Sequence, residues 1–102
     1  MKLLTAAIAK KLPALYSQDG KGMEAKAIVK FFDPSGSFTW YASEFDPTEG
    51  RFFGLVVSSH CPEGELGYFM LSELQSIRGR FGLGIERDLH WSPTALKDCP
   101  RF

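Results

Sequence analysis

The middle of the chain alternates between apolar and polar positions in a pattern that predicts two neighbouring β-strands. Residues 38–45 and residues 51–57 are rich in aromatic and β-branched side chains, which favour a pleated and partly buried surface. Between them, Pro47 presets the backbone for a turn, and Gly50 accepts the positive φ that the return strand requires. The pattern therefore predicts an antiparallel hairpin at the centre of a sheet.

Three further segments have the character of strands. Residues 25–32 precede the hairpin, residues 65–70 follow it after a loop, and residues 85–91 alternate like a late edge strand. Residues 81–84 include two glycines and are expected to form a tight connection before that last strand. Short connections join the first three strands, so we expect them to be neighbours in the sheet.

A first helix is predicted over residues 5–12. Thr5 is a favourable N-cap residue, and Leu4, Ile8 and Leu12 recur at a spacing that places them on one face of a helix. We expect this face to pack on the sheet.

A second helix is predicted over residues 72–78. Ser72, followed three residues later by Gln75, fits a capping box in which Ser72 is the N-cap. Leu74 should face the core, and Gly79 is expected to end the helix.

These elements predict an α+β fold, in which an N-terminal helix and a second helix pack against a four- or five-stranded, mainly antiparallel sheet. The chain has 102 residues, and we expect one domain over residues 1–102. With 44% hydrophobic and 14% aromatic residues it can bury an ordinary core without staples. The residues after Pro93 are expected to form an exposed tail in which Cys99 reacts readily with thiol reagents.

Charge and cysteine content limit the classes of partner. The formal net charge is zero, which argues against a dedicated duplex-DNA binder, because such proteins gain affinity by neutralising phosphates. Cys61 and Cys99 form no close pair motif, and this favours a reducing, cytoplasmic setting. No run approaches the roughly 20 apolar residues of a membrane span. We therefore expect a cytoplasmic protein that does not bind membranes.

A set of short motifs runs through most of the chain, from Leu3 to about Pro93. The motifs are Leu12-Pro13, Leu15-Tyr16, Val29-Lys30-Phe31-Phe32, Thr39-Trp40-Tyr41, Glu44-Phe45-Asp46, Phe52-Phe53-Gly54-Leu55-Val56, Glu65-Leu66-Gly67-Tyr68-Phe69, Leu71-Ser72-Glu73-Leu74 and Ile85-Glu86-Arg87-Asp88-Leu89. Together they resemble a bacterial family of unknown function, number 2958 in the series of such domains. That family lies mostly on plasmids, integrative elements and phages. The resemblance implies an accessory protein of a mobile genetic element, and it implies no catalytic residues.

The residue types needed for catalysis or metal binding are few and poorly spaced. His60, Cys61, His90 and Cys99 are the only imidazoles and thiols, and their spacing matches no common zinc motif. His60 and Cys61 are adjacent and point opposite ways in an extended chain, which disfavours a nucleophile–base pair. We therefore expect no metal and no cofactor, and we favour a non-catalytic role, with an enzymatic role kept as a third alternative.

Arg87 lies in the densest charged cluster, with an acidic residue on each side. Alternation places Arg87 on the apolar side of its strand, so we expect it to be half-buried and paired with Glu44 or Glu65. The alternative is that Arg87 binds a phosphate or an acidic group of a partner.

An aromatic strip has more large side chains than a small core usually needs. It consists of Phe38, Trp40 and Tyr41 in one strand and Phe52, Phe53, Tyr68 and Phe69 in neighbouring strands. If exposed, Trp40, Tyr41 and Phe52 could anchor a protein interface. They could also stack on bases of a single strand while Lys26 and Lys30 hold its phosphates. The candidate binding residues are therefore Lys26, Lys30, Trp40, Tyr41, Phe52 and Arg87.

The zero net charge and the acidic middle of the chain favour a protein partner over a nucleic acid. We expect a non-catalytic binding module that serves a mobile genetic element, for example in anti-defence. Its partner would be an unidentified protein, such as a host defence or DNA-maintenance component. The alternative is a single-stranded nucleic-acid-binding protein that uses the exposed aromatics and the lysines.

Overall fold

The structure is a computed structural model that describes residues 2–101, apart from the Arg80 side chain. The predicted domain of residues 1–102 includes Met1 and Phe102, which lie outside the described residues. The strands are β1 (Lys26–Ala27), β2 (Val29–Phe32), β3 (Thr39–Asp46), β4 (Arg51–Ser58), β5 (Cys61–Met70), β6 (Glu86–Arg87) and β7 (Thr94–Ala95). The helices are α1 (Ala6–Lys11) and α2 (Leu71–Ser76), with 3₁₀ turns η1 (Gly22–Glu24), η2 (Arg80–Gly82) and η3 (Leu96–Asp98).

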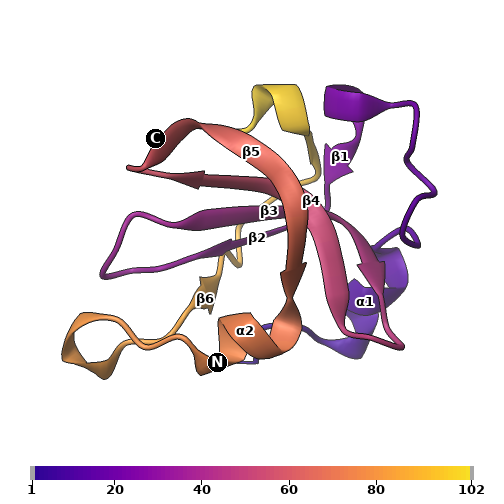
Figure 1. Ribbon diagram of the computed structural model, residues 1–102. Helices are drawn as coiled ribbons and strands as arrows, with labels where there is room; N and C mark the ends of the chain where they lie inside the picture. Colours follow the sequence, from indigo (N-terminus) through magenta and orange to yellow (C-terminus); the bar gives the residue numbers. More distant parts are fainter. Residues whose placement is uncertain (1, 102) are drawn as a thin grey trace.

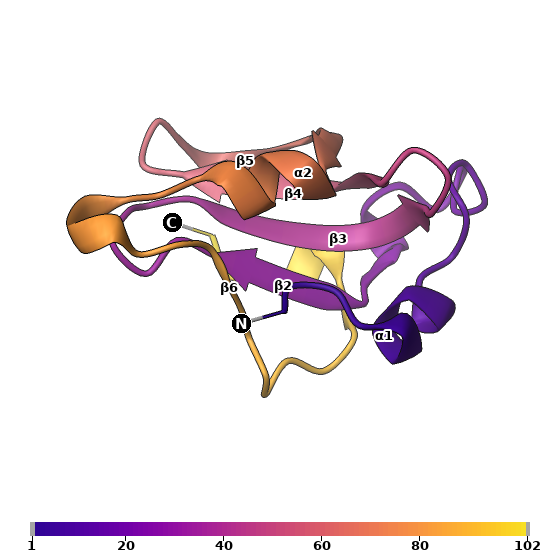
Figure 2. The same ribbon diagram turned by 90° about the horizontal axis from the view of Figure 1, so that it is seen from below.

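The predicted α+β fold is confirmed. Five antiparallel strands form one sheet in the order β5-β4-β3-β2-β6, and β1 pairs with β7 in a separate small sheet. The strand expected over residues 25–32 is divided at Ile28, whose N–H donates to the carbonyl of Ala42 (2.8 Å). Figure 1 shows β5 curving across the front of the molecule into α2, with both α-helices at the bottom of the view. Figure 2, the view from below, shows α2 near β4 and β5 and α1 near the end of β2.

The central hairpin forms as the sequence predicts. β3 and β4 pair from Thr39 opposite Val57 to Asp46 opposite Arg51. Gly50 has a φ of 70°, and its N–H closes the turn on the carbonyl of Asp46 at 2.8 Å. The required positive φ explains why glycine occupies this position.

The connection after β4 is shorter than predicted. The expected loop over residues 58–64 is a tight turn, and β5 already begins at Cys61. The buried hydroxyl of Ser58 accepts hydrogen bonds from the N–H groups of His60 and Cys61, both at 3.2 Å. A side chain that satisfies two turn amides lets the chain reverse within a few residues.

The first helix matches its prediction closely. Its N-cap is Thr5, whose hydroxyl accepts a hydrogen bond from the N–H of Ile8 at 3.2 Å. Leu12 is buried, and Leu4 and Ile8 pack against the same apolar cluster.

The second helix begins earlier than predicted. Its N-cap is Met70, and the carboxylate of Glu73 accepts the N–H of Met70 at 2.9 Å. Ser72 is therefore an exposed residue of the first turn and not the cap, and the helix ends at Ser76 before Gly79 is reached. Leu74 is buried as expected, with 1% of its surface exposed.

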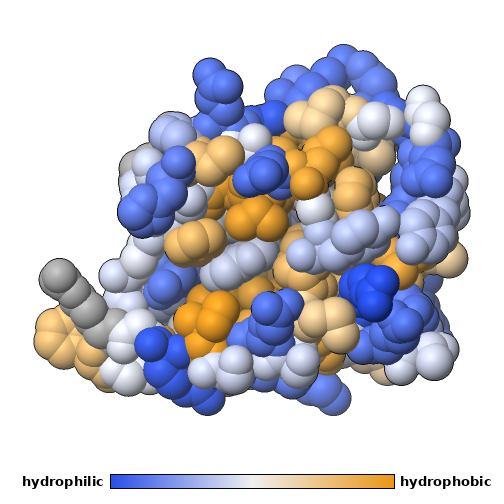
Figure 3. Space-filling model, viewed as in Figure 1, coloured by the Kyte–Doolittle hydropathy of each residue, from blue (hydrophilic) through white to orange (hydrophobic). Residues whose placement is uncertain are grey.

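Both faces of the sheet are covered by apolar groups. On the first face, the ring of Phe52 contacts those of Phe31, Phe45 and Phe69, with centroids 4.6–5.4 Å apart. The N-terminal segment and both α-helices pack on this first core. Figure 3 shows apolar side chains gathered between hydrophilic ones over the strands.

The second face is covered by the C-terminal residues, so the predicted exposed tail is wrong. Leu96 and Cys99 are buried against Tyr41 and Leu55. The hydroxyl of Tyr41 also donates to the carbonyl of Pro100 at 2.7 Å. Because Cys99 is buried, ready labelling of its thiol is not expected.

Within the described residues, every helix is too short or too polar to cross a bilayer.

We predict that Leu74→Ala lowers the free energy of unfolding by about 2–5 kcal/mol, because it leaves a cavity under α2. Ser72→Ala is the matched control from the same helix and should change stability by less than about 0.5 kcal/mol. Urea unfolding of both variants checks this. An equal effect of the two substitutions would contradict the placement of α2.

Alkaline pH should destabilise the protein through its second core. Burial raises the pKa of Cys99 from 9.0 to about 11 and that of Tyr41 from 10.0 to about 12. Folding favours the protonated form of both side chains, so both contribute fully to stability below pH 9.0. The contribution of Cys99 is lost as the pH rises through about 11, and that of Tyr41 as it rises through about 12. We expect the melting temperature to fall over this range, and to fall less in Cys99→Ala. If the melting temperatures of the wild type and of Cys99→Ala fall in parallel, Cys99 does not contribute to the pH dependence.

Candidate binding surfaces

The three aromatic residues singled out from the sequence are all buried. Phe52 has no exposed surface and lies at the centre of the first core. Trp40 stacks on Phe38 with centroids 5.6 Å apart. Tyr41 belongs to the second core, beside Trp91 at 5.4 Å. These three residues therefore divide between two cores and offer no common exposed surface for stacking.

The two lysines have different surroundings. Lys26 is exposed in β1, where it lies opposite Ala95. The ammonium of Lys30 lies 3.7 Å from a carboxylate oxygen of Asp88 and 5.6 Å from the centre of the Trp91 ring. Lys30 and Tyr41 are thus brought together around Trp91. The Lys30 ammonium is already paired with Asp88 and lies over the Trp91 ring, so it is not a free cation for a phosphate.

Arg87 fastens the N-terminal segment to the sheet. Its Nη1 donates to the carbonyl oxygens of Lys2 and Leu3, at 2.6 and 2.9 Å. The expected pairing of Arg87 with Glu44 or Glu65 is wrong. Both carboxylate oxygens of Glu44 accept backbone N–H groups, and Glu65 lies on β5, at the opposite edge of the sheet from Arg87. A cation that binds two carbonyls in this way explains its half-buried position.

The exposed aromatic surface lies elsewhere, on the edge strand β5 and its neighbour β4. Tyr16 and Tyr68 are 58% and 52% exposed, and Leu66 beside them is also exposed. The Tyr68 ring contacts Phe53 at 5.1 Å and Tyr16 at 6.5 Å, and the Arg51 guanidinium lies 5.7 Å from its centre. We call these five residues the tyrosine patch.

The two phenols of the tyrosine patch lie close enough to influence each other. The neighbouring Tyr16 phenol raises the pKa of Tyr68 above its usual value, and the carboxylates of Asp19 and Glu44 act in the same direction. The Tyr68 hydroxyl is therefore a neutral donor or acceptor at physiological pH.

A buried carboxylate positions Tyr16. Glu44 accepts the N–H of Tyr16 at 2.9 Å and that of Gln18 at 2.8 Å, although only 3% of Glu44 is exposed. Tyr16 has a φ of 70°, a left-handed conformation that costs a residue with a side chain about 1–2 kcal/mol. The two charge-assisted bonds offset that cost and present the Tyr16 ring to solvent.

The patch borders a free sheet edge, because β5 is the outermost strand of the sheet in the described residues. The N–H of Leu71 donates to the carbonyl of Gly50 at 2.9 Å, which extends the β4–β5 ladder by one bonded pair. Bonded and non-bonded pairs alternate in an antiparallel ladder. The main-chain groups of Leu66 and Tyr68 therefore point to the open side.

Residues 3–96 match the model of one protein family, described as a protein of unknown function (DUF2958). The chain belongs to the DUF2958 family. Comparisons with curated proteins and with solved structures found no match. The matched region of this DUF2958 protein includes the whole tyrosine patch, the β5 edge and both helices.

Sequence reasoning counted Phe53 and Tyr68 of this DUF2958 protein in the aromatic strip but did not select them as candidate binding residues, although one signal was available. Strand alternation places Leu66 and Tyr68 on one side of β5, opposite the buried Phe69. Tyr16 could not have been assigned to this surface, because it comes from a loop that Glu44 holds across the strands.

We predict that Glu44→Gln lowers the stability of the DUF2958 protein by about 1–3 kcal/mol, because the amide has one acceptor oxygen where two backbone N–H groups now bond to two. Glu65→Gln removes the same charge from an exposed position and is the control, with an effect within about 0.5 kcal/mol. Denaturant unfolding gives both values. If the two substitutions have equal effects, Glu44 does not clamp the loop.

Proposed function

We propose that this chain is a non-catalytic binding module whose partner is a protein. The observation that carries the proposal is the tyrosine patch, in which Tyr16 and Tyr68 remain more than half exposed beside Arg51. Tyrosine and arginine are among the residues that contribute most of the energy of protein interfaces.

The tyrosine patch is also ordered before a partner arrives. Phe53 and Arg51 contact the Tyr68 ring, and Glu44 fixes the backbone of Tyr16. Side chains that are already held lose less conformational entropy on association. This supports the patch as a binding surface, since its contact residues need little rearrangement.

The free edge of β5 adds main-chain groups to the surface. An extended segment of a partner can bond to the open N–H and C=O groups of Leu66 and Tyr68, as in β-strand addition. Its side chains on one face would then contact the two tyrosines.

Acidic residues surround the surface and favour a partner with a basic rim. Glu63 and Glu65 are exposed on β5, and Asp19 is exposed in the loop that carries Tyr16. Glu49 is exposed as well but already pairs with Arg51 at 2.7 Å. Such charges steer a complementary partner and suppress wrong ones more than they add affinity.

The resemblance to a protein family found mostly on mobile genetic elements supports the biological setting that we propose. The module would act in the cytoplasm as an accessory protein of such an element, with a host defence or DNA-maintenance component as its partner. An anti-defence role would require only that the bound partner be sequestered, which a binding surface without catalytic groups can do.

Photocrosslinking tests this function directly. With benzoylphenylalanine in place of Tyr68, we expect a discrete covalent adduct in cells that carry the element. The adduct should disappear when Leu66→Lys is added, because a charge then occupies the patch. The matched control carries the same crosslinker at Lys21, an exposed loop position outside the patch.

The outcomes separate the possible occupants. An adduct with a defence or DNA-maintenance protein supports the proposal, whereas an adduct with a second copy of the chain identifies self-association instead. Equal crosslinking from position 68 and position 21 would refute a binding surface at the patch.

A further inference from the structure

Residues 77–85 form a finger that projects beside α2 (Figure 1). The N–H of Gly79 donates to the carbonyl of Leu83 at 2.7 Å, and Arg78 and Gly84 form a bridge at the base. Gly79 lies so close to the turn after β2 that a Cβ there would overlap the hydroxyl of Ser35. The finger is thus a closed hairpin whose base is braced against the sheet.

Phe81, within the finger, combines an exposed side chain with a left-handed backbone conformation. Its side chain is 93% exposed, more than any other large apolar residue that the structure describes. Its backbone is left-handed, with a φ of 60° and a ψ of 19°, a conformation that costs energy for any residue with a Cβ. The ring therefore contributes almost nothing to the core, while its backbone is strained.

The charge of the finger is wholly positive. Residues 77–85 include Arg78 and Arg80 and no acidic residue. Nη1 of Arg78 donates to the carbonyls of Gln75 and Ile77, both at 2.8 Å, which fixes the direction of the guanidinium.

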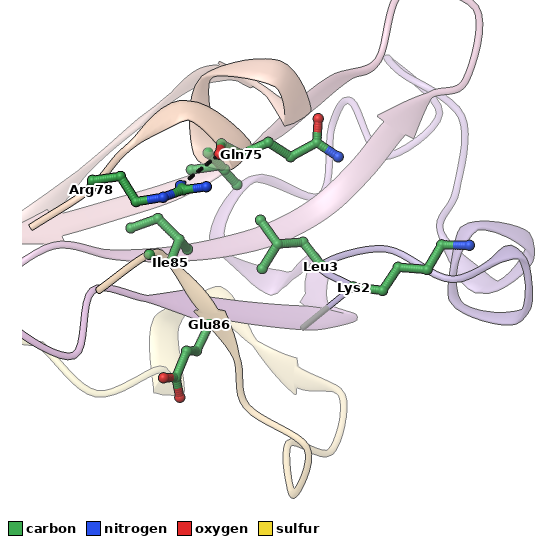
Figure 4. A pocket seen from close by; sticks show the side chains of 8 residues that line it. Lys2, Leu3, Gln75, Arg78, Ile85 and Glu86 are labelled. Carbon is green, nitrogen blue, oxygen red and sulfur yellow. Dashed lines mark hydrogen bonds between the residues drawn. The ribbon is translucent and has the colours of Figure 1, made fainter. Parts of the chain in front are cut away.

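A cavity of about 420 Å³ lies at the base of the finger. Lys2 and Arg78 line it together with the apolar side chains of Leu3 and Ile85. Glu86 is the acidic residue of this lining, and Figure 4 shows its carboxylate pointing away from Arg78. The charge that faces the cavity from the finger is therefore the Arg78 guanidinium.

We propose that the finger binds single-stranded nucleic acid, with Phe81 stacked on an unpaired base and Arg78 in contact with the backbone phosphate. An exposed aromatic ring and a cation on the same short segment is the combination that binds single strands without sequence preference. Stacking would also give a use to a ring that contributes little to the fold. The finger shares no residue with the tyrosine patch, so this inference does not depend on the proposed protein interaction.

The test is fluorescence anisotropy with a labelled oligothymidine of about 12 nucleotides, in about 50 and about 200 mM salt. The wild-type protein should bind at the lower salt and lose affinity at the higher salt. Phe81→Ala should weaken binding about 5- to 100-fold, the loss of one stacked base. Arg78→Gln should reduce the slope of log affinity against log salt by about 0.7, the value for one phosphate contact.

Three controls keep the result specific to the finger. Leu89→Ala removes an exposed apolar side chain outside the finger and should leave oligonucleotide binding unchanged. Tyr68→Ala should leave it unchanged as well, which separates this site from the tyrosine patch. Phe81→Gly should raise the melting temperature by relieving the left-handed strain, and yet weaken binding as Phe81→Ala does.

No binding at the lower salt, or equal binding by wild type and Phe81→Ala, would overturn the proposal. Phe81-dependent sedimentation with vesicles of phosphatidylglycerol and phosphatidylcholine, without oligonucleotide binding, would overturn it in favour of a membrane surface.

Discussion

The loop between α1 and η1 owes its position to one buried carboxylate. A register shift between Ala42 and Glu44 turns Glu44 toward the second face of the sheet, where it accepts the N–H groups of Tyr16 and Gln18. A buried charge without such partners would cost several kcal/mol. β3 and the loop must therefore order together, and the tyrosine patch exists only when both are in place.

The aromatic content of the chain reflects a sheet that is covered on both faces. Phe52 and its neighbouring rings fill one face, and Tyr41 packs with Trp91 and Leu96 on the other. Two thin cores in a chain of this length require contributions from both ends. The C-terminal residues supply part of the second core, while Arg87 holds the N-terminal segment over the first.

Features that depend on local sequence were predicted from it, and those that depend on distant surfaces were not. The hairpin around Gly50 and the Thr5 cap need only neighbouring residues, and both formed as expected. Ser72 met the local rule for a cap, but the long β5 continues to Met70, and the helix starts there. Burial of Cys99 requires a sheet face that no local pattern reveals. For the same reason the predicted aromatic site turned out to be core, and the exposed Phe81 was treated as part of a tight connection.

The bond between Glu73 and Met70 has a consequence for solubility. A bare edge strand is a template on which identical chains can add without limit, as in fibrils. At one end of β5, the carboxylate of Glu73 accepts the N–H of Met70. At the other end, Pro62 has no N–H, and the guanidinium of Arg101 donates to the carbonyl of Glu63 at 2.8 Å. These groups shorten the stretch of β5 on which a second strand can add. The first turn of α2 thus limits edge-to-edge pairing of identical chains as well as starting the helix.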